Sequence, residues 1–370
     1  MTRETSTGPA ATGVSVPATD SPRNAAFDLL RIISIAGVVS IHTFGGIVSN
    51  ESIAGTPDWW LAKSFSAGFV WAVPVFVMLS GALNLGVHAH RGGPAAFYRR
   101  RVQRMLPALV VWTIVYLVVI RWFVLGQTFG PGALAKVLVD ATVYPHLYFL
   151  WLILGLVFVA PVLAAFLGNG GDGRAVVFAS TALAFTILVF LVPGVMAIAG
   201  APRPIHLGAL TMWLPYVGYF LAGYATTRLE RVRGVLLAAM IVVGLALISF
   251  SILQVTMLRS AVVLNALDPP GYLGIGTVIL SICIFSVVTS LLKNWTPRGH
   301  ASRLLTTMAD ASFGVYLVHM IVLLAIHRVW EPYGLNASWL AAALAFVVIL
   351  TVSFVVSIMM NRIPVLRSVF

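Results

Sequence analysis

Residues 146–163 read HLYFLWLILGLVFVAPVL, a run with no Lys, Arg, Asp or Glu that stays apolar to residue 167. Similar runs of about 20 residues recur along the chain, and they do not alternate between apolar and polar positions. A helix of that length crosses the hydrocarbon core of a bilayer and satisfies its own backbone hydrogen bonds there. The sequence therefore predicts an all-α, polytopic membrane helix bundle rather than a β-barrel.

The composition indicates that lipid surrounds much of the chain. Of 370 residues, 60% are hydrophobic and 9% are charged, whereas a soluble domain has about 25% charged residues. The net charge of +12 would suggest nucleic acid in a soluble protein. Here we expect membrane lipid as the partner and no nucleic acid, because basic loops face an anionic cytoplasmic leaflet. The single cysteine, Cys283, excludes a disulfide framework within one chain.

Hydropathy predicts about ten transmembrane helices joined by short loops. Residues 1–24, rich in Thr, Ser, Pro and Ala, are expected to form a disordered cytoplasmic tail, without the apolar stretch of a signal peptide. Residues 25–362 should form one membrane domain, and 363–370 a short cytoplasmic tail. The ten spans are expected at roughly 26–48, 64–87, 104–125, 146–167, 175–193, 208–227, 233–254, 271–292, 308–328 and 338–361.

The distribution of basic residues predicts the orientation of these spans. With the N-terminus inside, 16 of the 23 Lys and Arg residues lie in inner segments, six lie in outer segments and Arg31 lies within a span. This is the positive-inside pattern, so both termini should be cytoplasmic in a multi-pass plasma or inner-membrane protein. A miscount of one helix would scramble the asymmetry, which therefore also supports ten spans.

The first span contains Asp28, Arg31 and His42. Ionisable side chains within a span are costly and usually face the bundle interior, where they have a function. Arg31 and His42 are 11 residues apart, so they share a helix face about 16 Å apart along the axis. Two structural interpretations stay open. Arg31 could pair with Asp28 or reach the cytoplasm, and His42 could be a hydrogen-bonded core residue.

Four arginines cluster where the third span enters the membrane: Arg99, Arg100, Arg101 and Arg104. Helical spacing of three and four residues allows several of them to converge on one anion. Guanidinium groups suit phosphates because two parallel N–H bonds match two oxygens. The alternative is ordinary topology signalling and contact with lipid head groups.

The ninth span carries Ser312, Tyr316 and His319 at i, i+4 and i+7. This polar stripe should face protein or a water-filled cavity rather than lipid. A structural hydrogen-bonding role and a catalytic role are both open.

Two further segments permit more than one interpretation. The segment 144–151, YPHLYFLW, includes His146 and could form an interfacial aromatic belt or line an outer cavity for an acceptor sugar. Ser80 and Gly81 are most simply packing residues. The sequence shows no nucleotide-binding or metal-binding signature, so no metal is expected.

Taken together and in this order, these segments resemble the acyltransferase 3 family of integral membrane O-acyltransferases, in its short stand-alone type. The resemblance covers about residues 25–362 and departs from the family at SGAL, where many members have Phe or Tyr after Ser-Gly. It is carried by FDLLRIISIAGVVSIH (Arg31 to His42), PVFVMLSG, RVQRMLP (Arg101 to Arg104), HLYFLWLILGLVFVAPVL, YFLAGY at 219–224 and SFGVYLVH at 312–319.

The resemblance implies transfer of an acyl group, expected to be acetyl, from acyl-CoA to a hydroxyl of a surface glycan, lipid-linked sugar or related acceptor of the cell envelope. Acyl-CoA would be a co-substrate, with no tightly bound cofactor. Arg101 and Arg104, with Arg31 and Arg100, would bind its phosphates. His42 would act as general base or as a covalent acyl carrier, and His319 and Tyr316 would orient it or stabilise the oxyanion.

A transporter or flippase for a glycan or small polar metabolite is the main alternative, because it would also have many spans and buried polar residues. Transporters often contain repeats with interrupted helices, and none is visible here. A transporter also gives no reason for the spacing of Arg31 and His42 together with Arg101 and Arg104. A purely structural membrane subunit leaves the charges within the spans unexplained.

Overall fold

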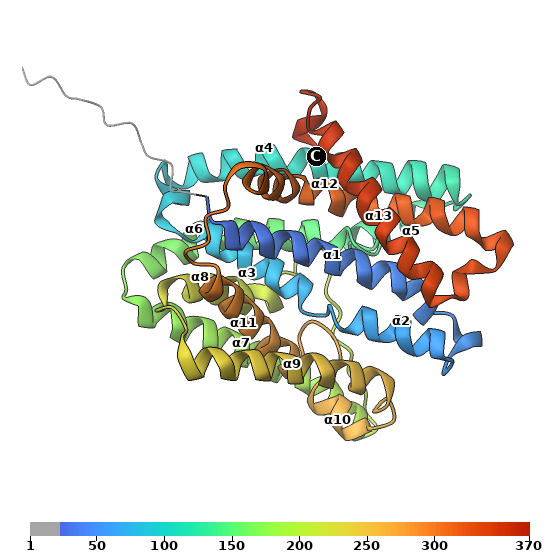
Figure 1. Cartoon of the computed structure of the whole chain (residues 1–370), viewed down its shortest axis with the longest axis horizontal. Helices are drawn as coiled ribbons and strands as arrows, with labels where there is room; N and C mark the ends of the chain where they lie inside the picture. Colours follow the sequence, from blue (N-terminus) through green and yellow to red (C-terminus); the bar gives the residue numbers. More distant parts are fainter. Residues whose placement is uncertain (1–22) are drawn as a thin grey trace, which may run out of the picture.

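The computed structural model describes residues 23–370 as helices and connecting turns, with no β-strand among them. Most of the long helices run along the long axis of the molecule (Figure 1). The helices are α1 (Ala25–Val48), α2 (Pro57–Ala67), α3 (Ala72–Asn84), α4 (Gly93–Ile114), α5 (Pro131–Val139), α6 (Tyr148–Gly168), α7 (Asp172–Ile198), α8 (Val217–Arg228), α9 (Gly234–Thr256), α10 (Val262–Leu267), α11 (Ile275–Leu291), α12 (Gly299–Trp330) and α13 (Trp339–Met360).

The helical membrane bundle predicted from the sequence is confirmed. In the described part of the chain, eight helical segments are long and apolar enough to cross a membrane, counting α2 with α3 and α4 with its π-helical extension Val115–Val124. The apolar helix α11 has 17 residues and α8 has 12. The count of ten spans and the cytoplasmic termini stay predictions. Most of the predicted tail, residues 1–22, lies outside the described residues.

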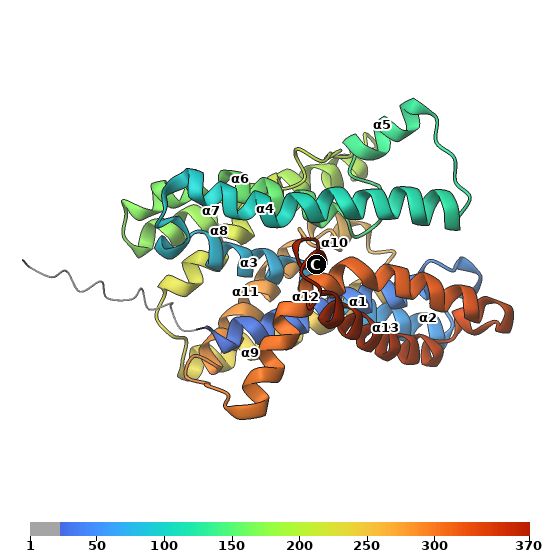
Figure 2. The same ribbon diagram turned by 90° about the horizontal axis from the view of Figure 1, so that it is seen from above.

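The helices differ in how deeply they lie in the bundle. In the most apolar window of α12, 61% of the residues are buried, against 11% in α9. Figure 2 shows α4, α6 and α7 on one side of α3, and α1, α9 and α12 on the other. The central helices α1, α3 and α12 are therefore the elements that position an interior site.

The second predicted span, 64–87, is two helices rather than one. Its first part, α2, already begins at Pro57, where the Thr56 side chain caps it by accepting a hydrogen bond from Trp59 N. The chain then breaks after Gly68, and α3 begins at Ala72. Gly37 of α1 packs against this break, because a Cβ there would lie 2.8 Å from Phe69 Cδ1.

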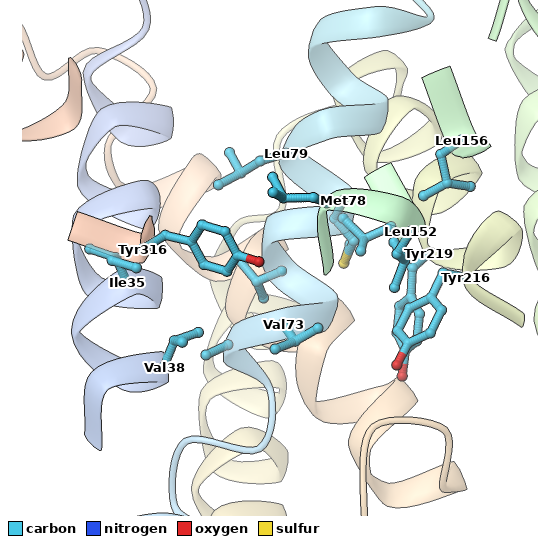
Figure 3. Packing of buried hydrophobic residues seen from close by; sticks show 14 of the residues in the cluster. Ile35, Val38, Val73, Met78, Leu79, Leu152, Leu156, Tyr216, Tyr219 and Tyr316 are labelled. Carbon is cyan, nitrogen blue, oxygen red and sulfur yellow. The ribbon is translucent and has the colours of Figure 1, made fainter. Parts of the chain in front are cut away.

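The helices α3 and α8 cross with almost no space between their backbones. A Cβ at Gly81 would lie 1.7 Å from Phe220 O, and one at Gly223 would lie 1.9 Å from Met78 O. Small residues allow helices to approach this closely, so the packing interpretation of Gly81 is confirmed. Figure 3 shows the apolar core near this crossing, where Met78 lies among side chains of α6 and α8.

Candidate active site

An interior cavity, about 500 Å³ in volume, lies between α1, α3, α4, α6 and α12. This volume is within the range of about 300–1,000 Å³ that is usual for small-molecule sites. The wall is mostly apolar, with a few polar groups at its two ends. Among its polar lining residues are Arg31, Arg101, Arg104 and Asp310 at one end, and His42, His146 and Tyr316 at the other.

Three guanidinium groups gather at the first end of the cavity. They belong to Arg31 of α1 and to Arg101 and Arg104 of α4. The Arg101 guanidinium lies 5.6 Å from the centre of the Phe97 ring. Within residues 23–370, no carboxylate lies within 4 Å of Arg101 or Arg104. The positive charges of Arg101 and Arg104, which no acid neutralises at this distance, suit an anion with several charges, such as a phosphate.

Arg31 also belongs to a network of ion pairs at the start of α1. Asp28, which is 4% exposed, lies 2.5 Å from Arg23 Nε and 3.5 Å from Arg31 Nη1. Arg23 pairs in addition with Asp310 at 2.9 Å. The hydrogen bond to Asp28 raises the pKa of Arg23 above its ordinary value. The pairing of Arg31 with Asp28 is therefore confirmed, but Arg23 is the closer partner and Arg31 still faces the cavity.

Arg100 does not join the other predicted phosphate-binding residues. Its side chain is exposed and donates a hydrogen bond from Nη2 to Ala89 O at 3.0 Å. It is not part of the cavity wall that contains Arg101 and Arg104. Its helical position places Arg100 on a different face of α4 from Arg101.

Three histidines from three separate elements meet at the other end of the cavity. His42 belongs to α1, His146 lies just before α6, and His319 belongs to α12. The ring centroids are 5.3 Å apart for His42 and His319, 5.0 Å for His146 and His319, and 6.4 Å for His42 and His146. His42 and His146 line the cavity, whereas His319 lies behind them and is 0% exposed.

The hydrogen bonds of His319 determine which of its nitrogens carries the proton. Nδ1 lies 2.7 Å from Tyr316 O and 3.1 Å from Val315 O. Both oxygens are acceptors, so Nδ1 is the donor and Nε2 of the neutral ring carries the lone pair. Within residues 23–370, this buried Nε2 has no hydrogen-bond partner, and the same is true of both ring nitrogens of His146. Buried polar atoms without partners are unusual and often mark functional sites.

Two tyrosines hold the backbone around this cluster. The Tyr316 hydroxyl donates to His146 O at 2.6 Å, and the Tyr116 hydroxyl donates to Leu317 O at 2.7 Å. Tyr116 lies in the π-helical extension of α4, a local geometry that is frequent at functional sites. The hydroxyl hydrogen of Tyr316 is thus engaged by a carbonyl, so its geometry favours positioning over donation to an oxyanion.

His146 is the member of this cluster that sequence reasoning did not select as catalytic. Of the two interpretations of segment 144–151, the structure supports a cavity wall, because Pro145, His146 and Tyr148 all line the cavity. No helical spacing relates position 146 to His42 or His319. In the sequence, only the aromatic residues around His146 in segment 144–151 indicated that it could line a cavity. Among the described residues, no three His, Cys, Asp or Glu side chains are arranged to hold a metal ion.

A membrane helix bundle whose interior cavity joins arginines to a histidine cluster has the features of a membrane-embedded transferase. The family model described as an acyltransferase domain matches residues 24–358, nearly the whole chain. The chain therefore belongs to the acyltransferase 3 family and is a multi-pass membrane acyltransferase. No curated protein and no solved structure gives a significant match to it.

Proposed function

We propose that this protein transfers an acyl group, acetyl in the first instance, from acyl-CoA to a hydroxyl of a surface glycan, lipid-linked sugar or related acceptor at the plasma or inner membrane. The observation that carries the proposal is the single cavity that joins Arg101 and Arg104 to His42 in a chain of the acyltransferase 3 family. Family membership argues against the transporter alternative.

The arginine end of the cavity is where the donor's phosphates would bind. Arg31, Arg101 and Arg104 offer forked N–H donors that match phosphate oxygens. Arg31 and His42 are separated by about 16 Å along α1. The extended pantetheine arm of CoA covers such a distance, so a donor held by the arginines would present its thioester to His42.

His42 would act as general base. It would take the proton from the acceptor hydroxyl while that oxygen bonds to the thioester carbonyl carbon, and the C–S bond would then break. His42 would return the proton to the departing CoA thiolate, which leaves the ester and CoA–SH as products. Imidazole suits both transfers because it changes protonation state near neutral pH.

His319 would position His42 in this scheme. A centroid separation of 5.3 Å brings the free Nε2 of His319 close enough to accept a hydrogen bond from His42 after a modest ring rotation. That bond would leave the cavity-facing nitrogen of His42 with its lone pair. A covalent acyl-His42 intermediate is the alternative route, and it would let donor and acceptor react in two separate steps.

The test is transfer of label from radioactive acetyl-CoA by the purified protein in proteoliposomes, with glucose, glucuronate and lipid-linked sugars as acceptors and butyryl-CoA as a competing donor. The proposal predicts CoA–SH release and an alkali-labile acetyl ester on an acceptor. Acid-quenched protein that retains label before acceptor is added would support the acyl-His42 route. Absence of CoA–SH release with every donor and acceptor would contradict the proposal.

A further inference from the structure

A second cavity, about 310 Å³ in volume, lies beside the first. Its wall comes from α1, α2, α9, the start of α11 and the loop before it. Ile41 and Tyr272 line both cavities, and Ile41 is the chain neighbour of His42. The second cavity therefore adjoins the first where the candidate catalytic histidine lies.

The second cavity approaches His42 from the end of the molecule opposite the arginines. Ile41 lies ten residues beyond Arg31 on α1, about 15 Å further along the helix axis. Figure 1 shows α2 at this far end, opposite the start of α1. A molecule in the second cavity would thus reach His42 without passing the cluster of Arg31, Arg101 and Arg104.

Three polar side chains of the second cavity are free to bind a ligand, whereas Ser251, which also lines it, donates a hydrogen bond to Leu247 O. Lys63, Ser66 and Thr277 lie in its wall. Within residues 23–370, none of these three side chains forms an ion pair or donates a hydrogen bond, although neighbouring Gln254 donates to Asp268 O. An ammonium group and two hydroxyls suit a ligand with many oxygen atoms.

Two positive charges lie at one indole ring: Lys63 belongs to the wall of this cavity, and Arg259 lies outside the wall. Lys63 Nζ lies 5.7 Å, and Arg259 Cζ 5.0 Å, from the centre of the same Trp59 ring. Among the described residues, neither has a carboxylate within 4 Å. The carboxylates nearest in sequence bind helix N-termini instead: Asp58 accepts from Trp339 N at 2.7 Å and Asp268 from Gly276 N at 3.2 Å. Two like charges at one indole ring repel each other, and an anion bound between them would relieve that repulsion.

We propose that the second cavity is the acceptor site and that the acceptor is a sugar with an anionic group, a carboxylate or a phosphate. The inference rests on the proposed acyl transfer. The anionic group binds Lys63 in the cavity wall and Arg259 at the same Trp59 ring outside the wall, and a hydroxyl of the same sugar reaches His42 past Ile41 and Tyr272. Donor and acceptor then approach the histidines from opposite ends of the bundle.

The first experiment measures binding of glucuronate and glucose, which differ by one carboxylate, to the full-length protein in phosphatidylcholine nanodiscs. The variants are Lys63→Met and Arg259→Gln. Lys136→Met is the matched control, because Lys136 already pairs with Asp140 at 2.6 Å. We expect the wild type to bind glucuronate about tenfold more tightly than glucose, and each site variant to lose most of that difference. Equal binding of the two sugars, or unchanged preference in Lys63→Met, would overturn the inference.

Two further experiments distinguish an acceptor site from a lipid head-group site and from a failure of the proposed acyl transfer. In nanodiscs with phosphatidylglycerol, glucuronate binding should persist, whereas its loss would assign the two charges to lipid head groups and overturn the inference. In the acetyl-transfer assay, Lys63→Met should raise the KM for glucuronate and leave that for acetyl-CoA unchanged. Transfer with an unchanged glucuronate KM would overturn the acceptor site alone. Lys63-dependent binding without any transfer would support the anion site and contradict only the acyltransferase chemistry.

Discussion

At the scale of single residues, Arg101 and Arg104 are informative because no ion pair ties either to another part of the described chain. Arg101→Gln and Arg104→Gln should each raise the KM for acetyl-CoA about tenfold, since each removes a charged hydrogen-bond donor to phosphate. Steady-state kinetics at saturating acceptor provides the measurement. Arg100→Gln is the control, because Arg100 bonds Ala89 O outside the cavity. An equal rise in KM for all three variants would refute a specific phosphate site.

His319 provides a test of positioning, because its two nitrogens have different tasks. His319→Asn keeps a donor near the position of Nδ1, which bonds Tyr316 O, but removes the free Nε2. His319→Gln places an acceptor near the position of Nε2. We expect kcat to fall about tenfold or more in the Asn variant, with both KM values unchanged, and to recover in part in the Gln variant. A purely structural role would be indicated by the same loss in both variants.

Helical periodicity in the sequence was enough to relate Arg31 to His42 and Tyr316 to His319. It could not show that Arg100 turns away from the cavity, because the loop carbonyl of Ala89 that holds it belongs to the tertiary structure. It also could not bring His146 to His42, because their contact depends on how α1, α6 and α12 pack together.

At the scale of helices, the crossing of α3 and α8 depends on Gly81. Gly81→Ala should destabilise the protein by about 1–3 kcal/mol, since its Cβ would overlap Phe220 O and force the two backbones apart. The melting temperature in detergent provides the measurement. Gly45→Ala in α1 is the control, because no atom lies within 4 Å of its added Cβ, and it should be neutral or slightly stabilising. Equal melting temperatures for both variants would mean that the α3–α8 contact is loose.

Hydropathy located every long helix, and several predicted starts lie within three residues of the observed ones, but the starts of α8 and α12 were missed. The helix α12 begins at Gly299, nine residues before the predicted span, because its first turns carry polar residues such as His300 and Arg303. The predicted span 208–227 becomes helical only near Pro215, and α8 proper begins at Val217. Capping and tertiary contacts determine where these helices begin, and an average of hydropathy over a window contains no information about either.

At the scale of the whole molecule, the orientation can be tested without any assay of activity. A reporter fused after Phe370 should read cytoplasmic, and one inserted between Glu331 and Ser338, after α12, should read external. Both outcomes follow from the excess of Lys and Arg in the predicted inner segments. Alkaline phosphatase and fluorescent-protein fusions provide the measurement. An external C-terminus would contradict the even number of spans.

The two substrates should enter from different ends of the bundle, because the second cavity lies opposite the arginine end of the first and shares with it Ile41, the neighbour of His42. The histidine is therefore the point on which donor binding, acceptor binding and proton transfer all depend.

The most direct measurement compares acetyl transfer by the wild type with that by His42→Ala, in proteoliposomes with saturating acetyl-CoA and acceptor. His88→Ala, which changes an exposed histidine outside the cavity, is the matched control. We expect kcat to fall about 10²–10⁴-fold in His42→Ala, with acetyl-CoA binding retained, and His88→Ala to keep wild-type activity. Transfer at the wild-type rate in a folded His42→Ala protein would show that His42 is not the general base.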